Sequence, residues 1–146
     1  MKIAVGSDHA AYEVKETLLS YLTSKNHTVI DVGTHSIDSC DYPDYAAEVS
    51  QLVQSSDVDR GLLICGTGIG MSIAANRFKG VRAALCTTVE LAELSRSHND
   101  SNLLCVGART QSLDDIKAII DKWLITEWEG GRHAGRLDKI EKLSKG

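Results

Sequence analysis

The chain lacks several features that mark specialised classes of protein. Its 146 residues include a single proline, Pro43, and no low-complexity tract, so we expect no linker and one domain, residues 1–146. No apolar run approaches the length of a membrane span, and the segment Met1–Gly6 lacks the apolar core of an export signal. We therefore expect a cytoplasmic globular protein with no membrane partner.

The chain also lacks an excess of positive charge and lacks closely spaced pairs of cysteines. The net charge is -4, which gives no electrostatic footprint for nucleic acid, so no nucleic-acid partner is expected. None of the four cysteines forms a C-x-x-C pair, which removes support for a zinc site or a thioredoxin-like site. Without an export signal, Cys40, Cys65, Cys86 and Cys105 are expected to be reduced thiols.

The nucleotide-binding motifs are absent as well. There is no Walker A sequence, and Gly66, Gly68 and Gly70 alternate instead of following the G-x-G-x-x-G spacing. The acidic residue that should follow such a fingerprint about 20 residues later is missing, because Ala84-Leu85-Cys86 stands there. The glycines therefore do not predict a dinucleotide site.

The chain does contain alternating strand and helix patterns. Apolar, strand-like segments alternate with segments whose apolar residues recur at helical spacing. The expected strands are 2–5, 28–32, 60–64, 81–85 and 103–106, and the expected helices are 11–25, 45–54, 71–76, 88–96, 112–123 and 132–146. Thr88 and Ser112 are expected to cap their helices. This order predicts an α/β, Rossmann-like three-layer sandwich: a five-stranded parallel sheet with helices on both faces.

Ligands in such sheets bind beyond the carboxyl ends of the strands. The polar residues expected at those ends are Asp8 and His9, Cys65 and Thr67, and Arg109. The simpler interpretation of Asp8 is that it caps the first helix.

Cys65 stands where the third strand meets the glycine-rich loop. Free backbone N–H groups in such a loop form a cradle for negative charge, and a thiol beside them can act as an acid or a base. The alternative is an ordinary tight turn between a strand and a helix. Cys86 and Cys105 fall in or beside apolar strands and are expected to be buried, and Cys40 receives no role.

Two further groups lie away from these strand ends. His98 and Asn99 occupy a turn before a strand, so they are expected at the opposite edge and can reach the site only from a neighbouring subunit. Arg132 and Arg136 stand four residues apart, which places both on one helix face as a phosphate clamp, with Arg109 as a third candidate. An ordinary polar turn and a solvated basic helix are the simpler alternatives.

Six motifs together resemble one known family. They are Gly6-Ser7-Asp8-His9-Ala10, Asp41-Tyr42-Pro43, Cys65-Gly66-Thr67-Gly68-Ile69-Gly70, His98-Asn99-Asp100, Gly107-Ala108-Arg109 and Gly130-Gly131-Arg132-His133. In this order they resemble the B-type ribose-5-phosphate isomerases, whose superfamily also holds the galactose-6-phosphate isomerase subunits. Some members place a glutamate after the glycine loop and lack the cysteine. Met71 stands at that place here, so the chain resembles the cysteine-type branch.

The resemblance implies an aldose–ketose isomerase without metal or cofactor. It would interconvert ribose 5-phosphate and ribulose 5-phosphate, in the non-oxidative pentose phosphate pathway, through ring opening and a cis-enediolate. The implied assembly is a homodimer with shared sites, with a tetramer left open.

The resemblance also implies a role for each site residue. Cys65 would be the base and His98, from the partner subunit, would open the ring. Asp8 would assist that step or hold hydroxyls, and Thr67 would move protons between the two oxygens. The remaining residues would bind the substrate. The enediolate would be bound by Gly66, Gly68, Ile69 and Gly70, and the phosphate by His9, Arg132, Arg136 and a partner-derived Arg109. The sugar would be contacted by Tyr42 and Asn99.

Three alternatives stay open at this point. The substrate could be allose 6-phosphate or galactose 6-phosphate, because the loop 34–44 sets the pocket depth and cannot be placed from sequence. A non-catalytic sugar-phosphate sensor would use the arginines and glycines but would not need Cys65, Thr67 and His98 together. A redox-sensing thiol is weakened by the lack of an obvious resolving cysteine.

Overall fold

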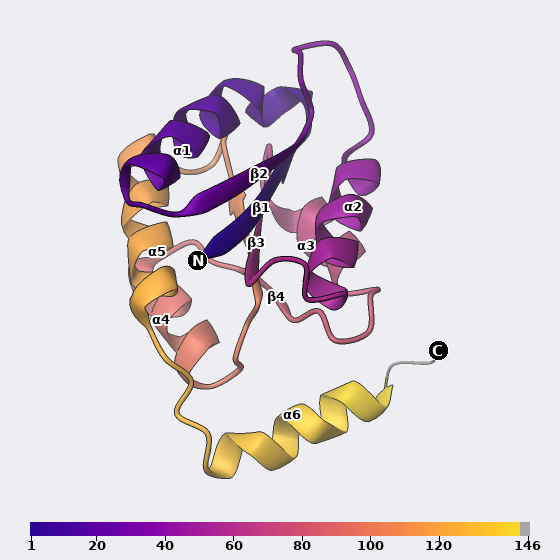
Figure 1. Cartoon of the computed structure of the whole chain (residues 1–146), viewed down its shortest axis with the longest axis vertical. Helices are drawn as coiled ribbons and strands as arrows, with labels where there is room; N and C mark the ends of the chain where they lie inside the picture. The colour runs from indigo at the N-terminus through magenta and orange to yellow at the C-terminus, as the bar shows by residue number, and fades with distance from the viewer. Residues whose placement is uncertain (144–146) are drawn as a thin grey trace.

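A five-stranded parallel sheet forms the centre of the computed structural model, which describes residues 1–143 (Figure 1). The strand order is β2-β1-β3-β5-β4. The strands are β1 Lys2–Ser7, β2 Thr28–Gly33, β3 Arg60–Cys65, β4 Ala83–Leu85 and β5 Leu103–Gly107. The helices are η1 His9–Ala11 (a 3₁₀ turn), α1 Tyr12–Ser24, α2 Tyr42–Gln54, α3 Ile69–Ala75, α4 Val89–Ser97, α5 Leu113–Ile125 and α6 Arg132–Leu143.

Each central strand sends alternate side chains to two separate hydrophobic cores. In β3, Leu62 and Ile64 join the core under α1, α4 and α5, whereas Leu63 and Cys65 join the core under α2 and α3. Figure 1 shows these two groups of helices on opposite sides of the sheet. The predicted α/β sandwich of three layers is therefore confirmed.

The order of the strands places the point where the crossovers diverge between β1 and β3. After β1 the chain crosses to β2 on one side, and it then returns to β3 on the other side of β1. Ligands of open α/β sheets bind at such a point, where the crossovers diverge. The register pairs Ser7 with Ile64, so the residues that follow them, Asp8 and Cys65, leave neighbouring strands at the same level.

Most of the expected elements are present, with shifted ends. The side chains of Thr88 and Ser112 accept backbone N–H groups of the helices that they precede, which confirms both predicted caps. Helix α2 begins at Tyr42, three residues earlier than expected, because Pro43 has the fixed φ that suits a first helical turn. Strand β4 is shorter than the expected 81–85.

Helix α6 extends away from the sandwich (Figure 1). Its buried side chains are His133 and Leu137, and Arg82 Nη1 lies 2.9 Å from Glu141 Oε1 in an ion pair that joins the helix to the start of β4. The helix was expected to run to residue 146, and residues 144–146 lie outside the described part of the chain.

Within residues 1–143, no helix has the length and apolar character needed to cross a membrane.

Candidate active site

Cys65 is the last residue of β3, and its side chain is held by the glycine-rich loop. The residue is 5% exposed, and its Sγ accepts a hydrogen bond from the backbone N–H of Gly68 at 3.1 Å. Gly68 has φ +81°, a left-handed conformation that glycine adopts without steric strain. This hydrogen bond fixes the sulfur beside the backbone N–H groups of the loop.

The loop leaves no room for side chains at two of its glycines. A Cβ on Gly68 would lie 2.7 Å from Leu85 Cδ1 and 3.0 Å from the backbone of Val106. A Cβ on Gly70 would lie 2.5 Å from the Tyr42 ring. These contacts fix the loop against β5 and the start of α2, so the backbone N–H groups are held in place before any ligand arrives.

Replacing Gly68 with alanine tests this requirement. We expect kcat for sugar-phosphate isomerisation to fall about 100-fold, because the strained and crowded Cβ shifts the donor on Cys65. Thermal unfolding should show a loss of about 1–3 kcal/mol. Gly80 offers a matched control, since it also has φ +81° but nothing lies within 4 Å of its Cβ position. Gly80→Ala should keep full activity, and an equal loss of activity in both variants would contradict the prediction.

Asp8 and His9 follow β1 at the same edge. The Asp8 backbone N–H donates to the Ile64 carbonyl at 3.3 Å, next to Cys65, and its Oδ1 caps η1 by accepting the Ala11 N–H at 3.2 Å. The capping role is thus confirmed. His9 Nδ1 accepts the Cys40 N–H at 3.2 Å, which leaves Nε2 of the neutral ring as a donor.

Thr67 and Arg109 complete this edge. Thr67 Oγ1 accepts the Ile69 N–H at 3.2 Å, and the Arg109 N–H donates to the Gly66 carbonyl at 2.9 Å. The Arg109 side chain lies along the loop, with its Cδ 3.4 Å from the Cβ position of Gly66. The resemblance implies that Arg109 serves the partner's site, and within this chain its side chain lies against the chain's own loop. The subunit to which Arg109 contributes stays a prediction.

The other buried cysteines have a different environment. Burial raises the pKa of the Cys105 thiol well above its ordinary value, and burial also raises the pKa of Cys86. Both side chains are enclosed in the cores, as predicted, and a thiol that resists ionisation is a poor base. Cys65 is the buried cysteine with a backbone donor at the strand edge.

A second group of predicted residues lies elsewhere in the chain. His98 ends α4, its N–H donating to Leu94 at 2.9 Å, and Asn99 follows in the turn that leads to β5. Because this turn precedes β5, it lies at the opposite edge of the sheet from Cys65. Arg132 and Arg136 are exposed on α6. The fold therefore divides the predicted site residues into two sets that one chain does not bring together.

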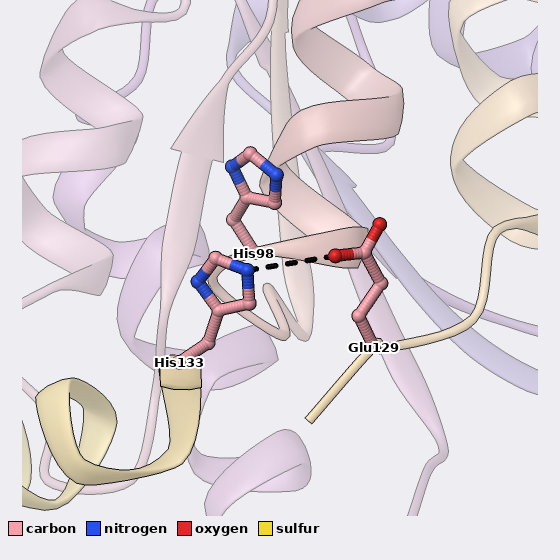
Figure 2. A group of neighbouring side chains, drawn as sticks. All are labelled: His98, Glu129 and His133. Carbon is pink, nitrogen blue, oxygen red and sulfur yellow. Dashed lines mark ion pairs between the residues drawn. The ribbon is translucent and has the colours of Figure 1, made fainter. Parts of the chain in front are cut away.

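Sequence reasoning assigned no role to two residues beside His98. The rings of His98 and His133 are stacked, with centroids 4.4 Å apart and planes 19° apart (Figure 2). Glu129 Oε2 lies 3.5 Å from His133 Nε2. His133 belongs to the motif Gly130-Gly131-Arg132-His133, but nothing in the sequence indicates that its ring stacks on the ring of His98.

Among residues 1–143, this cluster also has the ligand types of a metal site, because potential ligand atoms of His98, Glu129 and His133 all lie within 4.8 Å of one another. A metal ion lies in the plane of each imidazole that binds it. Two nearly parallel rings that face each other cannot share one ion unless a ring turns. That the site uses no metal stays a prediction.

The chain was also compared with known proteins. The family model of the Ribose/Galactose Isomerase family matches residues 3–140. The chain belongs to this family. It is 45% identical over 144 residues to "Ribose-5-phosphate isomerase B" of Escherichia coli, covering 99% of this chain and 97% of that protein.

Solved structures of Ribose/Galactose Isomerase family members share the fold. The chain matches the ribose-5-phosphate isomerase B of Clostridium thermocellum with TM-score 0.97 and 48% identity, covering 98% of this chain and 97% of that one. It matches the ribose-5-phosphate isomerase B of Mycoplasma genitalium, solved with bound ribulose-5-phosphate, with TM-score 0.94 and 40% identity, covering 97% and 95%. The likeness extends over almost the whole chain, so both sets of site residues lie within the matched fold.

Proposed function

We propose that the chain is an aldose–ketose isomerase that interconverts ribose 5-phosphate and ribulose 5-phosphate in the cytoplasm, as part of the non-oxidative pentose phosphate pathway. The observation that carries the proposal is the Cys65 sulfur, buried at the end of β3 and bonded to a backbone donor of a rigid glycine loop. Relatives named ribose-5-phosphate isomerase B, one of them with bound ribulose-5-phosphate, support the same substrate.

The proposed chemistry moves one proton between two carbons. Cys65 takes the proton from C2 of the open-chain aldose, and the carbonyl oxygen at C1 gains negative charge as the cis-enediolate forms. The N–H groups of Gly66 and Gly70 stabilise that charge, while the N–H of Gly68 donates to the Cys65 sulfur. Fixed donors of this kind contribute about 3–4 kcal/mol each. Thr67 moves a proton between O1 and O2, and Cys65 returns its proton to C1. A positioned base adds roughly 10²–10⁴-fold to the rate.

Ring opening requires the second set of residues. In solution ribose 5-phosphate is a furanose, so an acid or base must act at its ring oxygen and O1 hydroxyl before C2 can react. We assign this step to His98, assisted by Asp8, which lies beside Cys65 at the sheet edge. His98 lies at the opposite edge of its own chain, so His98 of a second copy has to complete the site.

A homodimer with shared sites explains several exposed features. Ile69 and Ile73 lie one turn apart on α3, beside the glycine loop, and are 51% and 59% exposed. Two such side chains at the edge of a site favour a partner surface over solvent. Helix α6 extends from the sandwich and carries Arg132 and Arg136 (Figure 1). A tetramer of such dimers stays open.

The phosphate would then be held from both chains. His9 and Arg109 approach from the chain that supplies Cys65, and Arg132 and Arg136 from the chain that supplies His98. Guanidinium groups suit this task because they donate paired hydrogen bonds to phosphate oxygens. Tyr42, packed against Gly70, and the partner's Asn99 would contact the sugar hydroxyls.

An exchange experiment in heavy water tests the proposed function. Ribulose 5-phosphate has its O5 esterified and cannot close a five-membered ring, so exchange at its C1 measures the Cys65 step alone. We expect deuterium at C1 of ribulose 5-phosphate and at C2 of ribose 5-phosphate, detected by proton NMR. A sugar-phosphate sensor would bind either compound without exchange, and that result would overturn the proposal.

The same assay distinguishes the candidate sugars. We expect kcat/KM to be at least about tenfold higher for ribose 5-phosphate than for allose 6-phosphate or galactose 6-phosphate, since one extra carbon in a fitted pocket is worth about 1–3 kcal/mol. Higher kcat/KM for either hexose phosphate would reassign the substrate and keep the reaction class.

A further inference from the structure

Glu129 lies in the segment that connects α5 to α6, and nothing in the mechanism above uses it. We propose that Glu129 is a positioning residue for His98 and that it acts through His133, an inference that rests on the proposed function, in which His98 opens the sugar ring. The three side chains come from three places in the chain: the end of α4, the connecting segment and the first turn of α6 (Figure 2).

Backbone contacts fix the connecting segment against His98. The N–H of Glu129 donates to the carbonyl of Ser97 at 3.0 Å, one residue before His98. Gly130 and Gly131 then adopt φ +66° and +58°, which reverses the chain and brings α6 back toward α4. The first helical turn closes with the His133 N–H donating to Gly130 at 3.2 Å. Glu129 and His133 are thereby held on the same side of His98.

The His133 side chain is buried between the exposed Glu129 side chain and the half-buried His98 ring. Glu129 is 59% exposed at its side chain, whereas the His133 side chain is 9% exposed and faces the His98 ring. The Glu129 carboxylate lies 3.5 Å from His133 Nε2, so it selects the ring rotation that turns this nitrogen outward. The flat face of His133 then limits the plane that the His98 ring can take. An acid or base that is tilted by a small angle loses much of its effect.

The attachment of α6 does not depend on Glu129. Leu137 is buried on the same helix, and the Arg82–Glu141 ion pair at 2.9 Å joins it to β4. A contact that has one solvent-exposed partner, such as Glu129–His133, contributes little to stability, about 0–1 kcal/mol. Loss of Glu129 should therefore alter the orientation of His98 and leave the fold and the Cys65 edge as they are.

Two assays on the full-length protein separate a positioning role from a structural one. Isomerisation of ribose 5-phosphate needs ring opening, and deuterium exchange at C1 of ribulose 5-phosphate does not. We expect Glu129→Ala to lower kcat/KM for ribose 5-phosphate about tenfold and to change the exchange rate less than twofold. Glu129→Gln should show a smaller loss, because it keeps the shape without the charge. The matched control is Glu127→Ala, an exposed glutamate of the same segment, which should leave both rates unchanged.

Slower ring opening also changes an isotope effect. With ribose 5-phosphate deuterated at C2, the primary kinetic isotope effect on kcat/KM should fall toward one in Glu129→Ala, since proton transfer then limits the rate less.

Combining Glu129→Ala with His133→Phe tests whether Glu129 acts on His98 through His133. Phenylalanine keeps a flat ring against His98 but has no nitrogen for Glu129, so Glu129→Ala should add no further loss in that background.

Three results would overturn the inference: equal losses in the two assays, a loss no larger than that of Glu127→Ala, or additive losses with His133→Phe. Failure of the proposed function would be recognised separately, because the wild-type protein would then show no Cys65-dependent exchange, and both proposals would fall.

Discussion

Cys65→Ala is expected to lower kcat for ribose 5-phosphate isomerisation by at least about 10³-fold. The variant keeps the glycine loop and its backbone donors but has no group that can take the C2 proton. Cys65 is 5% exposed and removing its sulfur leaves a small void, so the cost in stability should stay near 1 kcal/mol. Coupled-assay turnover and thermal unfolding measure the two effects.

Cys86→Ala is the matched control for this variant. Cys86 is also buried, but burial raises the pKa of its thiol, and it follows β4, which is two strands away from β3 in the sheet. Its loss should cost a similar amount of stability with activity within about twofold of wild type. Calorimetry should show that Cys65→Ala still binds ribose 5-phosphate. Near-normal turnover in Cys65→Ala would contradict the assignment of Cys65 as the base.

Mixing Cys65→Ala with His98→Ala subunits is expected to restore about a quarter of wild-type activity from two inactive proteins. In the proposed symmetric dimer each site takes Cys65 from one chain and His98 from the other. Random mixing makes about half of the dimers hybrids, and each hybrid has one intact site and one doubly defective site. Activity after exchange of subunits in mild denaturant and dilution measures the recovery.

The control for this experiment combines two variants from the same edge. Cys65 and Thr67 belong to one loop, so hybrids of Cys65→Ala and Thr67→Ala have a defect in every site. Their activity should not exceed the mean of the two parents. If the Cys65→Ala and His98→Ala mixture also shows no gain, while subunit exchange is verified by mass spectrometry, the shared site is wrong.

Local patterns were sufficient for much of this picture. The alternation of apolar segments predicted the parallel three-layer sandwich, because periodicity reports directly which side chains face a core. The caps Thr88 and Ser112 were predicted because a cap acts within three residues of itself. The division of Cys65 and His98 between opposite sheet edges followed from their places after and before a strand.

Contacts between distant segments could not be predicted in this way. The place of the Arg109 side chain depends on how β5 pairs with β3, and no local pattern indicates that it lies along the Gly66 loop. The early start of α2 brings Tyr42 onto Gly70, a contact between segments far apart in sequence. Neither fact has a local signal, since both arise from packing.

The amino-acid sequence by itself determined the class of fold, the position of Cys65 at a strand end beside a glycine loop, and the position of His98 at the opposite edge of the sheet. These are consequences of hydrophobic period, chain direction and backbone freedom, which act over a few residues. The tertiary structure decided the strand order, the N–H that Gly68 donates to Cys65, and the stack of Glu129, His133 and His98. Such contacts form only when segments meet, and the packing of the whole chain decides which segments meet.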